Sequence, residues 1–287
     1  MVGRGWTQPG GRPHAEALAL SQAGERAAGA TAYVTLEPCA HRSDRGTACA
    51  DALIASGVAR VVVGVRDPDP RTAGQGIERL RASGVDASCL DHALSRRSLI
   101  GYLIRTALGR PHVTLKIALS LDGCSALADG TSRWITGPQA RAHVHSRRAM
   151  SDAILVGGDT WRLDSPRLDV RLPVLENRSP ERWVLTCQSV EGARTISSPE
   201  AISDMGEAQY LYVEGGAQTA ASFLAADLVD RLELYRAPIV IGGGREAVRD
   251  IGLLKLAEAH DQWRMSERRQ LGSDEFTAYE RQRCLPA

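Results

Sequence analysis

The chain of 287 residues is poor in several features that would assign it to a class of protein. Its six cysteines are too few for the disulfide scaffold of a small secreted domain. It has no run of 18 apolar residues, so no transmembrane helix is predicted. The N-terminus lacks the basic and then apolar segments of a signal peptide, which predicts a cytoplasmic protein.

Neither sign of charge is in excess. Lys and Arg total 35 against 34 Asp and Glu, which gives a net charge of +1 at pH 7. A general nucleic-acid binder or membrane-surface binder would carry a basic stripe, and the sequence shows no such block. The charge balance therefore argues against both classes.

Short apolar runs alternate with helix-like stretches along the whole chain. Runs such as RVVVGV at 60–65 and AILVGG at 153–158 are continuous, as in strands buried on both faces of a largely parallel sheet. Strands that alternate with helices predict an α/β architecture. The tail at 261–282 is interpreted as two strands around LGSD, a closing hairpin. Gly and Pro in LGRPH end a helical run, which predicts two domains, 1–109 and 110–287.

The N-terminal half carries a group of metal-binding residue types. His14 and Glu16 follow Pro13, a favoured first-turn residue of helices, and Cys39 and Cys49 come later. One imidazole and two thiolates with an open fourth position are typical of catalytic zinc. The order H-x-E and then P-C…C is the signature of zinc-dependent deaminases, in which Glu16 would move the proton of a zinc-activated water. The alternative to a zinc site is that two buried cysteines and a surface histidine occur in this order by coincidence.

Nine residues separate the two cysteines where the general signature has two. The segments PHAE, YVTLEPCAH, CADALIASGVARVVVGVRDPDP and AGQGIERLRASGV resemble the deaminase domain of the bifunctional riboflavin-biosynthesis deaminase/reductase family, which has such a longer loop. The resemblance implies a cytidine-deaminase-like α/β/α domain with substrate contacts from His41, Arg45 and Asp67. The alternatives are a solvated loop for Arg45 and a turn-forming aspartate before proline for Asp67.

Beyond Pro111, two predicted strands run into glycine pairs, in ILVGGDT and LYVEGGAQT. Such glycines let a phosphate approach backbone N–H groups at a helix N-terminus. No G-x-G-x-x-G stands at a strand–helix turn, so a Rossmann domain lacks its fingerprint. Together with SLDG, SRWIT and DSPRLDVR, the glycine pairs resemble the reductase domain of the same family. That resemblance implies a dihydrofolate-reductase-like α/β domain that uses NADPH.

The resemblance also implies which residues of this domain bind ligands. The implied cofactor-binding residues are Ala118, Trp134, Thr160, Asp164, Gly216, Ala217, Gln218, Thr219, Ala220, Ala221 and Ser222. The implied substrate-binding residues are Ser132, Arg148, Leu168, Arg171 and Glu214. Arginine suits a ribose phosphate because its guanidinium forms bidentate hydrogen bonds, and a glutamate accepts from pyrimidine N–H groups and sugar hydroxyls. Lys116 is a further candidate cation, with a purely structural role as the alternative.

The segment between DVR at 169–171 and YLYVEGG at 210–216 is about half as long as in the family that the chain resembles. A helix–strand portion is therefore expected to be missing or replaced by a loop. A cofactor contact that the family makes after its central strand falls near Thr186 or Cys187, and neither residue is assigned to it.

The start of the chain departs from the resemblance as well. VGRGWT at 2–7 resembles the second strand of the family, and the helix and strand before it have no counterpart, so the deaminase domain is expected to be incomplete and Met1 to be a misassigned start. In the cytidine-deaminase fold the strand order is 2-1-3-4-5. We therefore expect residues 2–7 to lack a ladder partner and the strand at 32–37 to have an unpaired edge. The zinc ligands are expected to converge, with deaminase activity reduced.

The resemblance covers nearly the whole chain and predicts an enzyme of riboflavin biosynthesis with two cofactors, Zn²⁺ and NADPH. The first domain would deaminate 2,5-diamino-6-(5-phosphoribosylamino)pyrimidin-4-one, and the second would reduce the ribosyl group of 5-amino-6-(5-phosphoribosylamino)uracil to ribityl. The partners implied are these small molecules, without nucleic acid or membrane, in a homo-oligomer. The alternatives are a reductase with an inactive deaminase half, a nucleic-acid base deaminase and a non-catalytic zinc scaffold.

Overall fold

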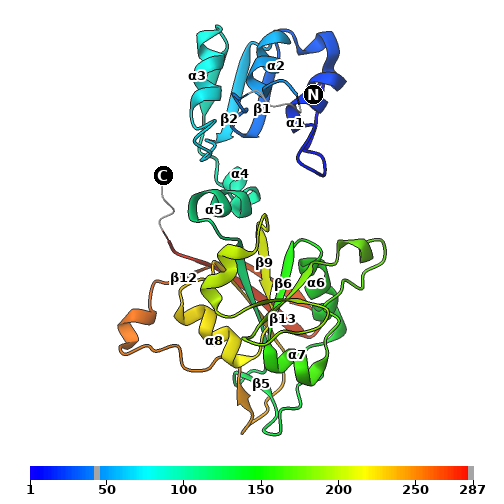
Figure 1. Cartoon of the computed structure of the whole chain (residues 1–287), viewed down its shortest axis with the longest axis vertical. Helices are drawn as coiled ribbons and strands as arrows, with labels where there is room; N and C mark the ends of the chain where they lie inside the picture. Colours follow the sequence, from blue (N-terminus) through cyan, green and yellow to red (C-terminus); the bar gives the residue numbers. More distant parts are fainter. Residues whose placement is uncertain (42–45, 284–287) are drawn as a thin grey trace. The chain divides into compact units, whose positions relative to one another are not determined.

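The computed structural model describes residues 1–41 and 46–283, which form two compact units (Figure 1). The first unit runs to Ala107 and the second begins at Leu108, beside the boundary expected between residues 109 and 110. Along the described residues, no helix has the length and apolar character that a membrane span requires.

The first unit is a parallel sheet of three strands, β1 (Thr31–Leu36), β2 (Arg60–Val65) and β3 (Asp86–Cys89), in the order β1-β2-β3. Every residue of β2 after the first is buried, as its continuous apolar run predicts. The core packs Leu53 and Leu80 from the helices against Val61 and Val63. The helical elements of this unit are α1 (Ala15–Ala23), η1 (Gly24–Ala27), α2 (Cys49–Ala55), α3 (Gln75–Ala82), α4 (Ala93–Ser98) and α5 (Ile100–Leu108).

Residues 2–7 form no strand, as expected, and β1 pairs only with β2 within the described part of the chain. The segment lies along α1 instead. A Cβ atom at Gly3 or Gly5 would lie 2.2 Å from the backbone oxygen of Ala19 or Ala15, respectively. The two glycines therefore allow a backbone-to-backbone approach that a larger residue would prevent.

The second unit is built on an eight-stranded sheet in the order β12-β13-β10-β4-β9-β6-β7-β8. The six strands from β10 to β8 are parallel, and β13 joins β10 antiparallel. The predicted closing hairpin is confirmed as β12 and β13. The strands are β4 (His112–Leu119), β6 (Ala153–Gly157), β7 (Glu181–Leu185), β8 (Arg194–Ile196), β9 (Tyr210–Val213), β10 (Arg231–Arg236), β12 (Trp263–Leu271) and β13 (Asp274–Arg281).

Both faces of this sheet are covered, which explains why the strand β6 is apolar and buried throughout. One core contains Leu155 with Phe223 of α8, and the other contains Ile154 with Val144 of α6. The remaining elements are the small sheet of β5 (Cys124–Ala126) and β11 (Arg245–Glu246), with α6 (Pro138–Arg148), α7 (Gly158–Asp164), η2 (Glu176–Arg178), η3 (Pro199–Asp204), α8 (Ala217–Ala225) and η4 (Leu256–Ala259).

The short segment before β9 contains β7, β8 and two 3-10 turns, and residues 186–193 join the two parallel strands without a helix. This agrees with the expected replacement of a helix–strand portion by a loop. Ile202 and Met205 from η3 and its end are buried against Trp183 and Ile196. These side chains cover the sheet where no crossover helix does.

The strand β10 ends at Arg236, and the following residues 237–244, APIVIGGG, form a loop. Asp122 of the SLDG motif holds that loop, because its carboxylate accepts from the backbone N–H groups of Ile241 (3.1 Å) and Gly242 (2.8 Å). The Ser120 hydroxyl also donates to Asp122, and these bonds lower the pKa of Asp122 to about 2. The motif therefore ties the turn after β4 to a distant segment.

A buried carboxylate organises the first unit in the same way. Glu37 is 3% exposed and accepts from the backbone N–H groups of Asp67 (3.2 Å), Gly74 (2.9 Å) and Ile77 (3.1 Å). It thereby joins the end of β1 to the segment that leads from β2 into α3. This contact explains why a glutamate precedes Pro38 and Cys39.

Replacing Glu37 with alanine should destabilise the first unit by roughly 3–5 kcal/mol, because three buried donors would lose their acceptor. Hydrogen exchange read by mass spectrometry should show lost protection between residues 67 and 77, and urea unfolding should shift to lower concentration. Glu25→Ala is the matched control, since Glu25 is exposed. Equal stability of the Glu37→Ala protein and the wild type would contradict this role.

Candidate functional sites

The three predicted zinc ligands meet in the first unit. His14 caps α1, Cys39 follows β1, and Cys49 is the first residue of α2. The His14 Nδ1 atom lies 3.3 Å from the Cys49 Sγ atom and 3.8 Å from the Cys39 Sγ atom. All three ligand atoms lie within 4.8 Å of one another, so the expected convergence is confirmed.

This geometry fits a zinc ion. Tetrahedral zinc with ordinary Zn–S and Zn–N bonds places its ligand atoms about 3.5 Å apart. The backbone N–H of Cys49 donates to the Cys39 Sγ atom at 3.3 Å, as helix N-termini do for thiolates. The hydrogen bond between the two thiols lowers the pKa of Cys39 and raises that of Cys49. The cluster therefore combines one imidazole with a thiolate-stabilising helix N-terminus, a donor set that zinc prefers.

Glu16 is half-buried beside this cluster without belonging to it. Burial raises the pKa of its carboxyl group, while interactions with His14 and the Cys49 thiol oppose that shift. A carboxylate next to a metal site is suited to accept and return a proton. Glu16, the expected proton carrier, therefore lies beside the predicted zinc ligands.

The expected substrate contacts of this unit are less clearly defined. His41 Nδ1 lies 3.4 Å from the Thr72 hydroxyl. The Asp67 carboxylate accepts from the Tyr102 hydroxyl (2.7 Å) and from the backbone N–H of Asp69 (2.9 Å). Asp67 therefore makes the turn contact that was the alternative to a substrate contact. Arg45 lies outside the described residues.

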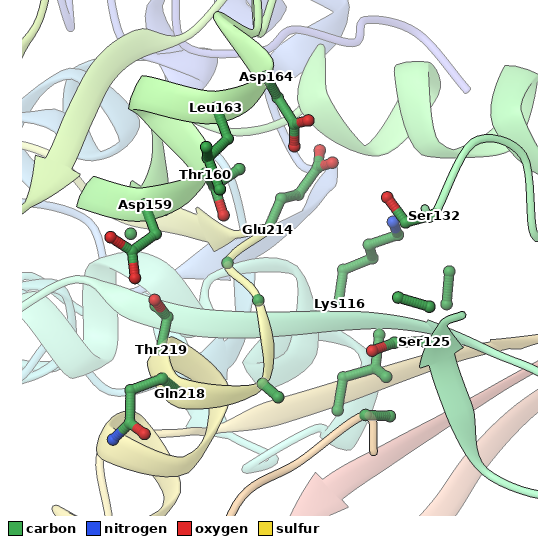
Figure 2. Close-up of a pocket in the computed structure, with 18 of the residues that line it drawn as sticks. Lys116, Ser125, Ser132, Asp159, Thr160, Leu163, Asp164, Glu214, Gln218 and Thr219 are labelled. Atoms are coloured by element: carbon green, nitrogen blue, oxygen red, sulfur yellow. The ribbon is translucent and has the colours of Figure 1, made fainter. Parts of the chain in front are cut away.

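A cavity of about 1060 Å³ lies in the second unit, at the carboxyl ends of β4, β9, β6 and β7 (Figure 2). Ligands of open α/β sheets bind at this edge. Most of the residues that the resemblance implied line this cavity: Ala118, Ser132, Trp134, Arg148, Thr160, Asp164, Arg171, Glu214, Gly216, Ala217, Gln218, Thr219 and Ser222.

Three implied residues do not line it. Ala220 and Ala221 are 1% and 2% exposed, because the helical period turns them toward the sheet. The Leu168 side chain is buried in the core with Ile154 and Tyr212, and it borders a separate small pocket. The side chains of these three residues therefore lie outside the cavity lining, and their assignment to ligand binding stays a prediction.

Arg148 also differs from the expectation of a free phosphate-binding guanidinium. Its Nε and Nη2 atoms donate to the two carboxylate oxygens of Glu214 at 2.6 and 3.0 Å, and its Nη1 atom donates to the Asp169 carbonyl at 2.9 Å. All three nitrogens are thus occupied, and Arg148 orients Glu214. Arg171 is 55% exposed and has one weaker ion pair, with Asp169 at 3.3 Å.

Lys116 lies in the cavity wall and points toward Ser132 (Figure 2), so the candidate cation is indeed at the site. Burial lowers the pKa of Lys116, and the nearby Glu214 opposes that effect. Burial would raise the pKa of Glu214, but Arg148 and Lys116 outweigh it and lower that pKa. Arg148 and Lys116 thus both favour the ionised form of the Glu214 carboxyl group.

Several lining residues were not assigned from the sequence. Asp159, Arg162, Thr186, Ser197 and Ser198 all border the cavity. Thr186 is one of the two positions near which a cofactor contact was expected. The segment around it is shorter than in the family, so no motif there could be matched to assign the contact. Asp159 lies within the ILVGGDT motif, whereas no periodic or motif signal marks Arg162, Ser197 and Ser198.

Two family profiles match the chain. The RibD C-terminal domain family matches residues 111–275, and the cytidine and deoxycytidylate deaminase zinc-binding region matches residues 2–65. Riboflavin biosynthesis protein RibD of Escherichia coli (strain K12) is 38% identical in an alignment that covers 96% of this chain and 88% of that protein. The protein of the same name from Mycobacterium tuberculosis is 38% identical over 96% of this chain and 85% of its own length.

Solved structures agree with these matches. RibD of Acinetobacter baumannii is similar with a TM-score of 0.87 and 31% identity, covering 98% of this chain and 89% of that chain. A diaminohydroxyphosphoribosylaminopyrimidine deaminase/5-amino-6-(5-phosphoribosylamino)uracil reductase from Thermotoga maritima is similar with a TM-score of 0.84 and 27% identity. It covers 98% of this chain and 88% of its own.

Metal analysis of the purified chain should find one zinc ion per chain. Cys39→Ser should lose the zinc, because it removes one of three protein ligands, whereas Glu16→Gln should retain it. Cys89→Ser is the matched control, since Cys89 is exposed and outside the cluster. A Cys39→Ser protein that kept its zinc would refute the assignment.

Proposed function

Because the chain belongs to the RibD family of riboflavin biosynthesis proteins, we propose that it catalyses two consecutive steps of that pathway. The first unit is a deaminase of 2,5-diamino-6-(5-phosphoribosylamino)pyrimidin-4-one. The second is an NADPH-dependent reductase that converts the ribosyl group of 5-amino-6-(5-phosphoribosylamino)uracil to ribityl. The observation that carries the proposal is that one chain holds both a three-ligand metal cluster beside Glu16 and a large cavity around Glu214.

In the deamination, His14, Cys39 and Cys49 would hold zinc, which supplies an activated water when bound. Glu16 accepts a proton from that water and delivers it to the departing amino group, so that water and the amine become a ring carbonyl and ammonia. A carboxylate serves both transfers, because it can be protonated in the first and release the proton in the second.

In the reduction, the N-terminus of α8 would hold the phosphates of NADPH, which supplies the hydride. Gly216 caps this nine-residue helix, and no side chain among the described residues satisfies its first N–H groups. A Cβ at Gly216 would have the Thr160 hydroxyl as its nearest neighbour, 3.8 Å away, so the backbone is open to the cavity there. These features fit a bound phosphate.

The substrate would lie between Glu214 and Arg171. Glu214, fixed by Arg148, accepts from pyrimidine N–H groups or sugar hydroxyls. Arg171 faces the same cavity with an exposed guanidinium and binds the ribose phosphate. Lys116 places a positive charge beside the sugar. The homo-oligomer expected from the resemblance stays a prediction, which sedimentation of the purified protein would test.

Glu16→Gln should lower the rate of deamination by about 10²- to 10⁴-fold, because the amide cannot carry the proton. The same variant should still reduce the deaminated intermediate with NADPH at the wild-type rate. Product analysis with each intermediate separates the two steps. If the wild-type chain reduces its intermediate but does not deaminate, the alternative of a reductase with an inactive deaminase half is correct.

Arg171→Ala should raise the KM for the ribose-phosphate substrate of the reductase and leave the Kd for NADPH unchanged, because the lost contact is to the substrate phosphate alone. Arg167→Ala is a matched control. Arg167 is exposed and pairs with the same aspartate, Asp169, but it borders the other pocket. If Arg171→Ala weakened substrate and cofactor binding equally, its assignment to the substrate phosphate would be wrong.

A further inference from the structure

We propose that Arg162 binds the 2′-phosphate of the cofactor and thereby selects NADPH over NADH, with Thr186 as its partner. This inference rests on the proposed reductase function. It concerns the end of the cavity formed by α7, the end of β7 and the segment after β8. Asp159, Arg162, Thr186, Ser197 and Ser198 line this end.

The order of the strands determines which part of the cofactor reaches this end. Lys116 lies on β4, Glu214 and the start of α8 follow β9, and β6 and β7 come next in the sheet. The nicotinamide of the cofactor would lie beside β4, and its phosphates would lie at the start of α8. The adenosine half of the cofactor then extends across the end of β6. Neighbouring strands are about 4.8 Å apart, so the end of β7 lies roughly 10 Å from that of β9. The ribose next to the adenine is therefore expected between α7 and Thr186.

Two polar groups converge at this point. A Cβ atom on Gly158 would lie 3.2 Å from the Arg162 Nη1 atom and 3.3 Å from the Thr186 Oγ1 atom. The Arg162 guanidinium and the Thr186 hydroxyl therefore both lie close to the backbone at Gly158, where even a Cβ atom would be crowded. Figure 2 shows the neighbouring Asp159 and Thr160 on the α7 side of the cavity, across from Gln218 and Thr219 of α8.

The hydrogen-bonding capacity of the two groups suits a phosphate. Thr186 Oγ1 accepts from the backbone N–H of Gln188 at 3.2 Å, which leaves its own hydrogen to be donated. Arg162 is the one arginine among the described cavity-lining residues that comes from α7, β7 or the segment after β8. A guanidinium and a hydroxyl together offer donors to a phosphate dianion, whereas a ribose 2′-hydroxyl is selected by a carboxylate.

Asp159 supplies such a carboxylate, and Arg162 pairs with it in this structure. The two side chains are 53% and 85% exposed, so their ion pair contributes little to stability and can give way to a doubly charged phosphate. Arg162 therefore has two effects on selectivity. It binds the 2′-phosphate, and it neutralises an aspartate that would otherwise favour the unphosphorylated ribose.

The test is equilibrium binding to the full-length protein. Calorimetry compares adenosine 2′,5′-bisphosphate with 5′-AMP, and the fluorescence of the reduced nicotinamide compares NADPH with NADH. Arg162→Gln should weaken both 2′-phosphorylated ligands by roughly 10- to 100-fold, because a charge-assisted hydrogen bond is lost. The Kd values for 5′-AMP and NADH should stay within about twofold, as for ligands that lack the phosphate.

Matched variants complete the test. Asp159→Asn should retain or tighten binding of the 2′-phosphate, and Thr186→Val should weaken it less than Arg162→Gln does. Arg167→Gln, which borders the other pocket, should change nothing. An equal loss of both ligand classes in Arg162→Gln, or no loss, would overturn the inference while leaving the reductase intact. A wild-type chain that binds no NADPH would instead refute the proposed reductase, and a chain that binds NADPH and NADH equally would refute only the role of Arg162.

Discussion

Both candidate sites depend on one constraint of parallel sheets, that the carboxyl ends of neighbouring strands meet at a common edge. In the first unit, β1 leads into Glu37 and Cys39 at this edge, and α2 starts there with Cys49. In the second unit, β4, β9, β6 and β7 bring Ala118, Glu214, Gly158 and Thr186 to the wall of one cavity. Residues far apart in sequence become neighbours because each follows a strand.

Two buried glutamates show how environment decides the role of a carboxylate. The Glu37 carboxylate accepts hydrogen bonds from three backbone N–H groups of its own unit. It therefore holds segments of the fold together and is not available to a ligand. Glu214 is held from one side by Arg148 and borders the cavity on the other. Its charge is kept by the cations around it, which leaves it able to accept from a ligand. Glu37 therefore stabilises the fold of its unit, whereas Glu214 presents its carboxylate to the cavity.

Much of the fold and the zinc cluster could be predicted, because apolar runs, glycine pairs and the spacing of His14, Cys39 and Cys49 are local signals. The β12–β13 hairpin and the convergence of the ligands were predicted for the same reason. The pairing of Arg148 with Glu214, and the inward orientation of Ala220, depend on packing between distant segments. Residue type alone cannot show whether an arginine is free or already bound. An exposed arginine on a short helix has no sequence pattern of its own, so the sequence does not indicate Arg162 as a site residue.

The loop held by Asp122 explains how a motif can identify a protein without touching its ligands. Asp122 does not border the cavity, yet Ser125, Ala126 and residues 245–247 do, and the turn it stabilises connects them to β4. Ala247 donates its backbone N–H to the Gly123 carbonyl at 3.1 Å, so the two segments are joined a second time. SLDG thus shapes the cavity wall without contacting a ligand, because its hydrogen bonds fix the course of two backbone segments that form part of that wall.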